Sequence, residues 1–120
     1  MKKFTLLVLV FLFTLPLFSQ TIKEEYYSYE GIESVVFYKK YDSLTNRILQ
    51  VGEFQNGLKN GNWYCYHPNG KINLIFSYYN GIKDGKWKQY DKNGRLISTV
   101  TYRRGNKISK TKYKYYLAIE

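Results

Sequence analysis

The chain repeats itself with a period of 24 residues, and this repetition limits the folds open to it more than any other feature. The two clear copies each carry a Gly-x-Trp step, then a Tyr, then Asn-Gly followed by a basic and an aliphatic residue. The residues that return in this way are Gly61 and Gly85, Trp63 and Trp87, Tyr66 and Tyr90, and Gly70 and Gly94. A fixed period of this length indicates tandem supersecondary units that stack on one another. Because these residues recur, we expect them to build the repeat rather than to contact a ligand.

Each copy is predicted to form a β-hairpin. An aromatic strand at 63–66 leads into a turn at 67–70, and a second strand at 71–78 ends at the turn Asn80-Gly81. Along the second strand apolar and polar residues alternate, which is the period of a strand with one covered face. The turns at 67–70 and 91–94 fit a type I turn closed by Gly in the left-handed region. No segment beyond the first twenty residues has a helical period, so we expect an all-β fold.

The copies differ in how well they keep the pattern. Residues 60–83 and 84–107 are clear copies, and residues 36–59 form a degenerate one in which Gly52 stands where the next copy has Phe76. Residues 108–120 are expected to form a capping strand, because Ser109-Lys110-Thr111 replaces the Gly-x-Trp step. Terminal repeats degenerate in this way where they must close an otherwise endless sheet.

The full pattern resembles a known repeat. Gly-x-Trp-x-x-Tyr-x-x-Asn-Gly-[Lys/Arg]-[Ile/Leu], followed by an aromatic residue and an Asn-Gly or Arg-Gly turn, is similar to the variant MORN repeat of bacterial proteins, which include families labelled toxin–antitoxin antitoxins. The likeness is strong over residues 52–107 and weak over residues 38–51. It implies tandem hairpins paired into an elongated, twisted antiparallel sheet, and a binding role rather than catalysis.

The N-terminal twenty residues have the composition of a secretory signal peptide. Two lysines precede an apolar run of 15 residues, Phe4 to Phe18, and polar residues follow. This run is shorter than the roughly 20 residues that a membrane helix needs. We therefore expect cleavage near Ser19 or Gln20, no transmembrane span afterwards, and a mature domain over residues 21–120. The expected location is the periplasm, the outer envelope or the outside of the cell.

Charge is spread unevenly along the expected domain. Residues 21–53 hold six acids and four bases, whereas residues 54–120 hold three acids and thirteen bases. This asymmetry favours an anionic partner near the C-terminal part, such as lipid headgroups or anionic envelope polymers, or else a protein partner. Nucleic acid is disfavoured, because an exported protein seldom meets it. The alternative interpretation is that the lysines only protect an edge strand from aggregation.

Candidate binding residues are those that vary between copies or belong to the basic C-terminal tract. Aromatic rings and cations are typical of contacting faces. The candidates are Tyr64, Tyr79, Lys86, Lys88, Tyr102, Arg103, Arg104, Lys110, Lys112 and Lys114. They predict that one aromatic and basic face of the sheet binds the partner.

Catalysis finds few suitable groups in the sequence. His67 is the only histidine and lies in a turn, and Cys65 is the only cysteine, so no disulfide can form within the chain. Metal ligands are not clustered, since the glutamates between residues 24 and 33 lack the spacing of a calcium loop and are interpreted as a solvated lead-in. We expect no cofactor and no enzymatic activity. The favoured function is a binding or scaffold module of the cell envelope, with an antitoxin-like binder and an envelope enzyme as alternatives.

Overall fold

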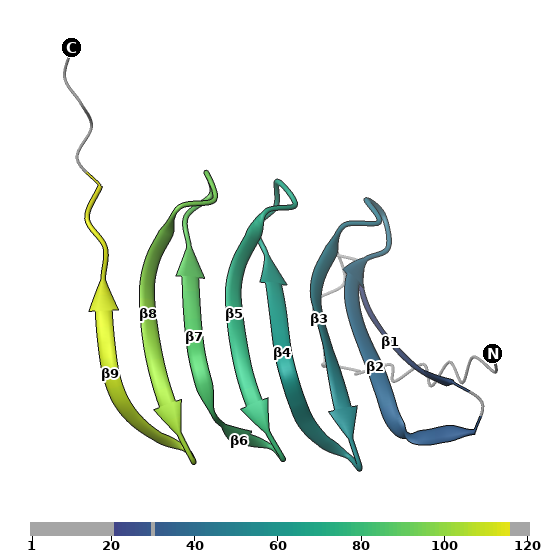
Figure 1. Ribbon diagram of the computed structural model, residues 1–120. Helices are drawn as coiled ribbons and strands as arrows, with labels where there is room; N and C mark the ends of the chain where they lie inside the picture. Colours follow the sequence, from purple (N-terminus) through teal and green to yellow (C-terminus); the bar gives the residue numbers. More distant parts are fainter. Residues whose placement is uncertain (1–20, 30, 116–120) are drawn as a thin grey trace, which may run out of the picture.

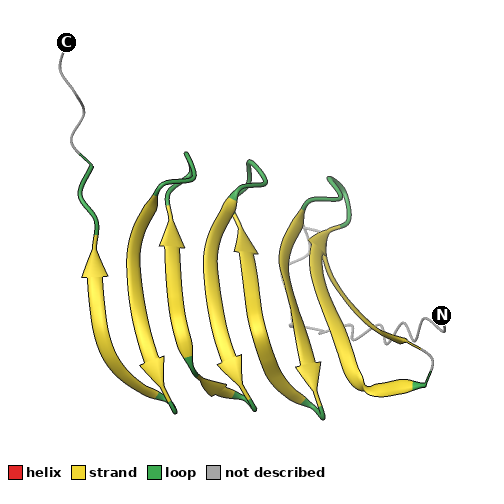
Figure 2. Ribbon diagram, viewed as in Figure 1, coloured by secondary structure: helices red, strands yellow, loops and turns green. Residues whose placement is uncertain are grey.

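A computed structural model describes residues 21–29 and 31–115, and it shows one antiparallel β-sheet (Figure 1). The strands are β1 (Ile22–Tyr29), β2 (Ile32–Asp42), β3 (Ile48–Gln55), β4 (Leu58–Tyr66), β5 (Ile72–Tyr79), β6 (Ile82–Lys83), β7 (Gly85–Tyr90), β8 (Leu96–Arg103) and β9 (Asn106–Lys112). They lie side by side in the order β1-β2-β3-β4-β5-β7-β8-β9, and the short β6 pairs with β5. In the described part of the chain, strands and their connecting loops are the only elements (Figure 2), so the all-β prediction is confirmed. The expected signal segment, residues 1–20, and residues 116–120 of the expected capping strand lie outside the described residues.

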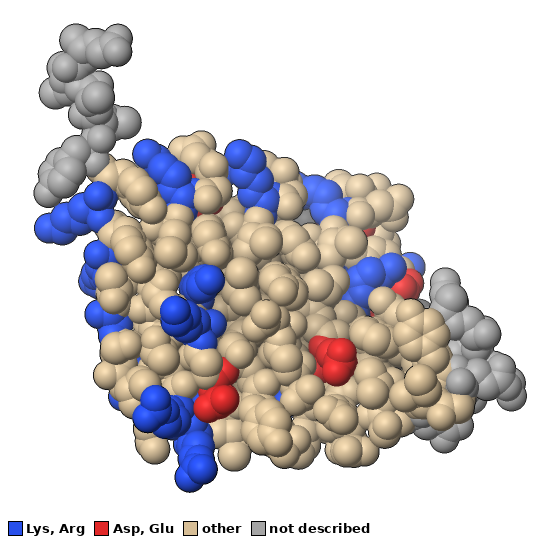
Figure 3. Space-filling view, in the orientation of Figure 1, with Lys and Arg blue, Asp and Glu red and all other residues tan. Residues whose placement is uncertain are grey.

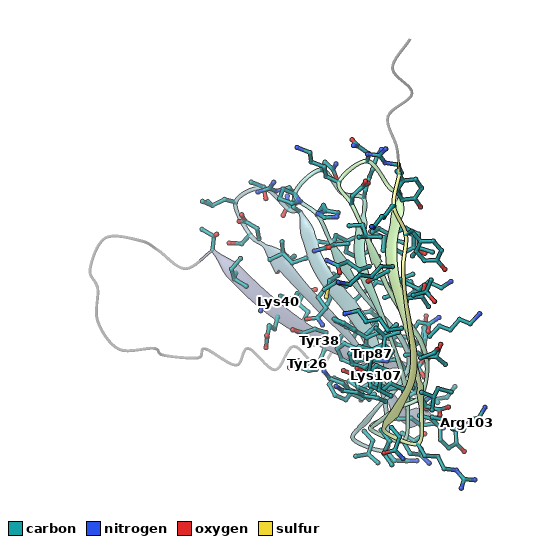
Figure 4. All side chains as sticks on the ribbon, turned by 90° about the vertical axis from the view of Figure 1, so that its left-hand side faces the viewer. Tyr26, Tyr38, Lys40, Trp87, Arg103 and Lys107 are labelled. Atoms are coloured by element: carbon teal, nitrogen blue, oxygen red, sulfur yellow. The ribbon has the colours of Figure 1, made fainter. Side chains whose placement is uncertain are left out.

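The sheet is a single twisted layer that curls toward one face, as the edge-on view in Figure 4 shows. Neighbouring strands are joined by hairpin turns that form two rims. We call the turns at 42–47, 67–71 and 91–95 the upper rim, and the turns at 55–58, 79–82 and 103–106 the lower rim, following their places in Figure 1. The sheet therefore has two broad faces and two rims at which a partner could be contacted.

Turns of the lower rim are tight because two successive residues adopt positive φ. Asn56 and Gly57 have φ of 49° and 78°, and the pair one period later, Asn80 and Gly81, has 48° and 78°. This is the geometry of the type I′ turn, whose twist matches that of the flanking strands and which favours Asn-Gly. In the last turn Arg104, with φ of 48°, takes the place of the Asn.

Turns of the upper rim close as the sequence predicted. The Gly70 N–H donates to the carbonyl of His67 at 2.9 Å, and Gly70 has a positive φ of 85°. Each turn also binds the next one along the rim. The guanidinium of Arg47 donates to the carbonyl of Pro68, and the ammonium of Lys71, one period later, donates to the carbonyl of Asn93. Residues spaced 24 apart thus link successive hairpins.

One face of the sheet carries both tryptophans, and we call it the Trp face; the other is the outer face. Trp63 is the most buried large side chain described, at 2% exposed, and it stacks on Tyr38, which is 7% exposed. The indole N–H of Trp63 donates to the carbonyl of Glu53, and that of Trp87 donates to the carbonyl of Ser77, again with a 24-residue offset. Since the described residues form a single layer, the sheet buries its rings against one another on this face, and these ring contacts contribute to its apolar packing.

Glu24 and Glu25 are part of the fold, which corrects for these two residues the interpretation of a solvated lead-in; Glu30 and the side chain of Glu33 lie outside what the structure describes. Glu24 accepts a hydrogen bond from the hydroxyl of Tyr38 at 2.9 Å on the Trp face. Glu25, on the outer face, pairs with the ammonium of Lys39 at 2.9 Å and accepts from the hydroxyl of Tyr41. The sequence missed this strand because it lies outside the 24-residue pattern and was assigned by its charge alone.

Candidate binding surfaces

Trp87 is packed less deeply than Trp63, and the reason lies on the preceding strand. Trp63 lies over Gly52, which has no side chain to displace it. At the position one period later stands Phe76, so the ring of Trp87 packs beside Phe76, with the centroids 4.6 Å apart. Tyr78 and Tyr102 complete the cluster at 5.3 and 5.0 Å from Trp87. The result is a group of partly exposed aromatic rings in the C-terminal half of the Trp face.

Lysine ammonium groups lie over both tryptophans. Lys59 is 4.6 Å from the ring centroid of Trp63, and Lys83, one period later, is 4.8 Å from that of Trp87. Lys83 also lies 5.1 Å from the ring of Tyr102. These distances are those of cation–π contacts. These two lysines were missed as functional candidates, although their 24-residue spacing is visible in the sequence.

The third lysine of this series, Lys107, has no tryptophan beneath it. It pairs with Tyr102 in the register of β8 and β9, so it lies on the Trp face (Figure 4). The residue four positions later is Thr111, where the earlier copies have Trp. Lys107 therefore presents its charge at the last strand of the sheet.

A change of register at β9 decides which face its lysines occupy. In β4 and in β6–β7, two extra residues are inserted opposite the preceding strand, next to Gly61 and Gly85 with φ of 72° and 92°. In β9 only one extra residue, Ile108, is inserted opposite β8. An even number of extra residues keeps the alternation of faces, whereas an odd number reverses it.

This reversal moves two candidate residues to the Trp face. Lys86 pairs with Thr101 and lies on the outer face, because its neighbour Trp87 lies on the other. Lys110, one period later, pairs instead with Val100 of β8. Val100 also pairs with Trp87 of β7, so Lys110 and Trp87 lie on the same face of the sheet. The same holds for Lys88 and Lys112. Residues at equivalent positions of the repeat thus lie on opposite faces.

The outer face holds a smaller set of candidates. Tyr64 pairs with Ile75, and Ile75 pairs with Lys88, so these three form a row across β4, β5 and β7. Figure 3 shows Lys and Arg side chains along the upper rim and toward the β9 end of the molecule, with few acidic groups among them. Strands β7, β8 and β9 contain no Asp or Glu.

A hollow of about 380 Å³ opens at the lower rim, between the turn at 79–82 and the turn at 103–106. Five residues line it: Tyr79, Ile82, Asp84, Arg103 and Arg104. The two turns are joined by a hydrogen bond from the Gly105 N–H to the carbonyl of Lys83 at 2.8 Å. The hollow gathers three of the candidate residues; Ile82 and Asp84 were missed because the sequence does not show that turns 24 residues apart are neighbours.

The ten candidates therefore do not share one face. Tyr102, Lys110 and Lys112 lie on the Trp face, whereas Tyr64, Lys86 and Lys88 lie on the outer face. Tyr79, Arg103 and Arg104 line the rim hollow. Lys114 follows the end of β9 and is exposed.

The residues assigned to the repeat itself occupy packing or turn positions. Gly61 and Gly85 lie at the extra residues inserted two positions before each tryptophan. Gly70 and Gly94 close the turns of the upper rim. Tyr66 and Tyr90 end the first strands of their hairpins.

The two groups considered for catalysis, His67 and Cys65, lie at an upper-rim turn and on the Trp face. The ring Nε2 of His67 lies 2.9 Å from the carbonyl of Tyr90 and donates to it, which fixes the turn to the next hairpin. Cys65 is half-buried on the Trp face, and burial raises the pKa of its thiol even though Lys59 and Lys40 act in the opposite direction. Within residues 21–29 and 31–115, no three His, Cys, Asp or Glu side chains come together as metal ligands would. In that same part of the chain no helix is long and apolar enough to cross a membrane.

Comparison with known proteins adds no relative: no family model, no curated protein and no solved structure matches the chain. The resemblance to variant MORN repeats accordingly stays a prediction.

Proposed function

We propose that this protein is a non-enzymatic binding module of the cell envelope, built of MORN-like hairpins, and that it binds an anionic partner through the C-terminal half of its Trp face. We call this region the basic-aromatic patch. Its members are Lys83, Trp87, Tyr102, Lys107, Lys110 and Lys112. The partner is an anionic surface of lipid headgroups or an anionic envelope polymer.

The observation that carries the proposal is the reversal of faces at β9. It sets Lys110 and Lys112 on the same face as the partly exposed rings of Trp87 and Tyr102, where Lys107 already lies through its pairing with Tyr102. Cations that neutralise an anionic surface and aromatic rings that lie at a polar–apolar boundary are complementary to such a partner. Without the reversal, Lys110 and Lys112 would lie on the outer face with Lys86 and Lys88.

The competing explanation is edge protection. All seven residues of β9 are exposed, and lysines on an edge strand discourage pairing with a second sheet. That role needs charge on the strand but does not depend on which face the charge occupies. Binding by the basic-aromatic patch does depend on the face, so the two explanations can be separated by comparing lysines on the two faces.

Equivalent lysines one period apart supply the matched pair. The variant Lys110→Gln/Lys112→Gln removes two charges from the Trp face, and Lys86→Gln/Lys88→Gln removes two from the outer face. Each Lys near an anionic surface contributes about 1 kcal/mol, so the first variant should bind vesicles containing phosphatidylglycerol about thirtyfold more weakly. The second should bind nearly as the wild type does. Added salt should weaken binding, because the Debye length falls from about 10 Å at 0.1 M to about 3 Å at 1 M.

Co-sedimentation with vesicles, and with a soluble polyanion in parallel, measures both variants. Equal losses for the two pairs would show that net charge alone matters and would reject the patch. Absence of binding by the wild type to both anionic probes would reject the anionic partner. If the Lys110/Lys112 variant aggregates while its outer-face counterpart stays soluble, edge protection explains the lysines.

The envelope location depends on the expected signal segment. We propose that the protein is exported and that the product begins near Gln20 or Thr21. N-terminal sequencing of the protein from fractionated cells tests this directly. A cytoplasmic product beginning at Met1 would overturn the location and, with it, the choice of an envelope partner.

A further inference from the structure

The hollow at the lower rim differs from the rest of that rim in its charge. It lies where the turn after β8 meets the turn after β5, and two adjacent cationic residues, Arg103 and Arg104, are among the residues that line it. One period earlier the same two positions hold Tyr79 and Asn80, and two periods earlier they hold Gln55 and Asn56. Only the last of the three equivalent turns therefore carries charge at these positions.

Arg104 keeps a backbone conformation that favours a different residue. Its φ of 48° belongs to the left-handed region, where Asn is tolerated and a long side chain is disfavoured. Asn56 and Asn80 occupy the equivalent positions with φ of 49° and 48°. A carboxylate oxygen of Asp84 accepts the N–H of Arg104 at 3.1 Å and helps to hold this turn. A residue kept against its backbone preference points to a use for its side chain.

The two guanidinium groups are free to bind a ligand. The ion pairs in the described part of the chain join Lys39 to Glu25 and Arg95 to Asp91, and neither includes Arg103 or Arg104. Both arginines are exposed. Guanidinium forks match the oxygens of a phosphate, and two of them on one turn can contact the same group.

The remaining walls of the hollow suit the rest of such a ligand. Tyr79 is 65% exposed and Ile82 is 50% exposed, so each offers apolar surface to a carbon skeleton. Asp84 has a second carboxylate oxygen that can accept a hydroxyl. A bare inorganic anion would gain nothing from these groups and would be repelled by Asp84.

We infer that the rim hollow binds the phosphate ester of a polyol, with Arg103 and Arg104 on the phosphate, Asp84 accepting a hydroxyl, and Tyr79 and Ile82 against the carbon chain. The site is separate from the basic-aromatic patch and does not depend on the function proposed for it. The same chemistry occurs in a soluble polyol phosphate and in the phosphatidylglycerol headgroup.

The test restores the turn that the chain uses elsewhere. The variant Arg103→Gln/Arg104→Asn gives the sequence Gln-Asn-Gly, which already forms the lower-rim turn at 55–57. Its melting temperature should equal or exceed that of the wild type, because Asn replaces Arg at a positive φ. Lys86→Gln/Lys88→Gln is the control, since it also removes two positive charges, in this case from the outer face.

Titration of the ¹⁵N-labelled protein with glycerol 1-phosphate, followed by NMR, reports binding at the site. The amides of Tyr79, Ile82 and Gly105 should shift, and inorganic phosphate should bind more weakly. The arginine variant should lose at least tenfold in affinity, as expected when charge-assisted hydrogen bonds are removed, and the control should not. Shifts elsewhere only, equal losses in the control, or tighter binding of inorganic phosphate would overturn the inference.

Vesicles containing phosphatidylglycerol identify the source of the ligand. If the arginine variant loses vesicle binding along with glycerol 1-phosphate, the lipid headgroup is the ligand. If it loses only glycerol 1-phosphate, the ligand is a soluble or polymeric polyol phosphate. The variant Lys110→Gln/Lys112→Gln should keep glycerol 1-phosphate binding in either case, so failure of the patch and failure of the hollow are distinguishable.

Discussion

The indole ring of Trp63 lies directly over Gly52 of the neighbouring strand. A β-carbon at Gly52 would come within 2.1 Å of the indole carbon Cδ2, which no side chain could tolerate without movement. Gly52 is thus the reason that Trp63 is almost completely buried while Trp87, which meets Phe76 instead, stays partly exposed. The degenerate first copy of the repeat supplies the space for the largest buried ring of the protein.

Gly52→Ala is expected to destabilise the protein strongly, because the methyl group must displace the indole. Overpacking of this kind costs about 1–3 kcal/mol or more in the free energy of unfolding. Denaturant titration measures the change. The double variant Gly52→Ala/Trp63→Ala should be destabilised by much less than the sum of the two single-variant effects, since both substitutions act on one contact. Additive effects would show that Gly52 does not make room for the ring.

Replacing either tryptophan by alanine is expected to destabilise the fold, and the structure ranks the two. Loss of a large buried aromatic side chain costs about 3–5 kcal/mol. Trp63→Ala should lie at the upper end of this range because Trp63 is 2% exposed. Trp87→Ala should cost less because Trp87 is only partly covered. If both variants melted with the wild type while losing a ligand, the packing role would be wrong.

The lysines over the tryptophans are expected to stabilise the fold through their charge. Lys59→Gln and Lys83→Gln should each reduce the free energy of unfolding by about 0.5–1 kcal/mol, the range of exposed cation–π contacts. Lys107→Gln is the matched control, because Lys107 occupies the same place in the repeat but has no tryptophan four residues later. Equal effects at all three positions would mean that net charge, and not the ring contact, is responsible.

Alkaline pH is expected to weaken the sheet through Tyr38. Burial, and then the hydrogen bond to Glu24, raise the pKa of the Tyr38 hydroxyl above its ordinary value of 10.0. A group whose folded pKa is raised contributes stability that is complete below its unfolded pKa and is lost as pH rises through the folded one. Unfolding followed by fluorescence from pH 9 upward should therefore show falling stability above about pH 10.

Tyr38→Phe is the variant that isolates this effect. Its free energy of unfolding should fall less steeply at alkaline pH than that of the wild type, because Phe has no hydroxyl proton to release. Tyr26, whose pKa is raised by burial and by Glu24, leaves a residual dependence. An unchanged slope in the Phe variant would assign the alkaline loss to other groups.

Restoring the Gly-x-Trp step in β9 is expected to undo the reversal of faces. Ser109→Gly/Thr111→Trp gives β9 the glycine that adopts positive φ at Gly61 and Gly85, together with a ring for Lys107 to cover. The added packing should raise the free energy of unfolding by about 1–2 kcal/mol. Lys110 should move to the outer face, so cross-strand NMR contacts between Val100 and Lys110 should disappear. Persistence of those contacts would show that the glycine does not set the register.

Local features of the sequence were enough to predict much of this architecture. The alternation along 71–78 and the turn residues Asn80-Gly81 depend only on neighbours in the chain, and they predicted hairpins that the structure confirms. The first strand, β1, was not predicted as a strand. It pairs with β2, but it lies outside the 24-residue pattern, so no repeat marks it in the sequence.

The sequence by itself determined that the chain is all-β, since two-residue alternation and repeated turn glycines are properties of short segments. Only the tertiary structure decided the faces. Whether Lys110 and Lys112 lie beside Trp87 or opposite it depends on how many residues are inserted between β8 and β9, which is a relation between strands and has no local signature. The rim hollow likewise exists only because turns 24 residues apart become neighbours when the hairpins pair.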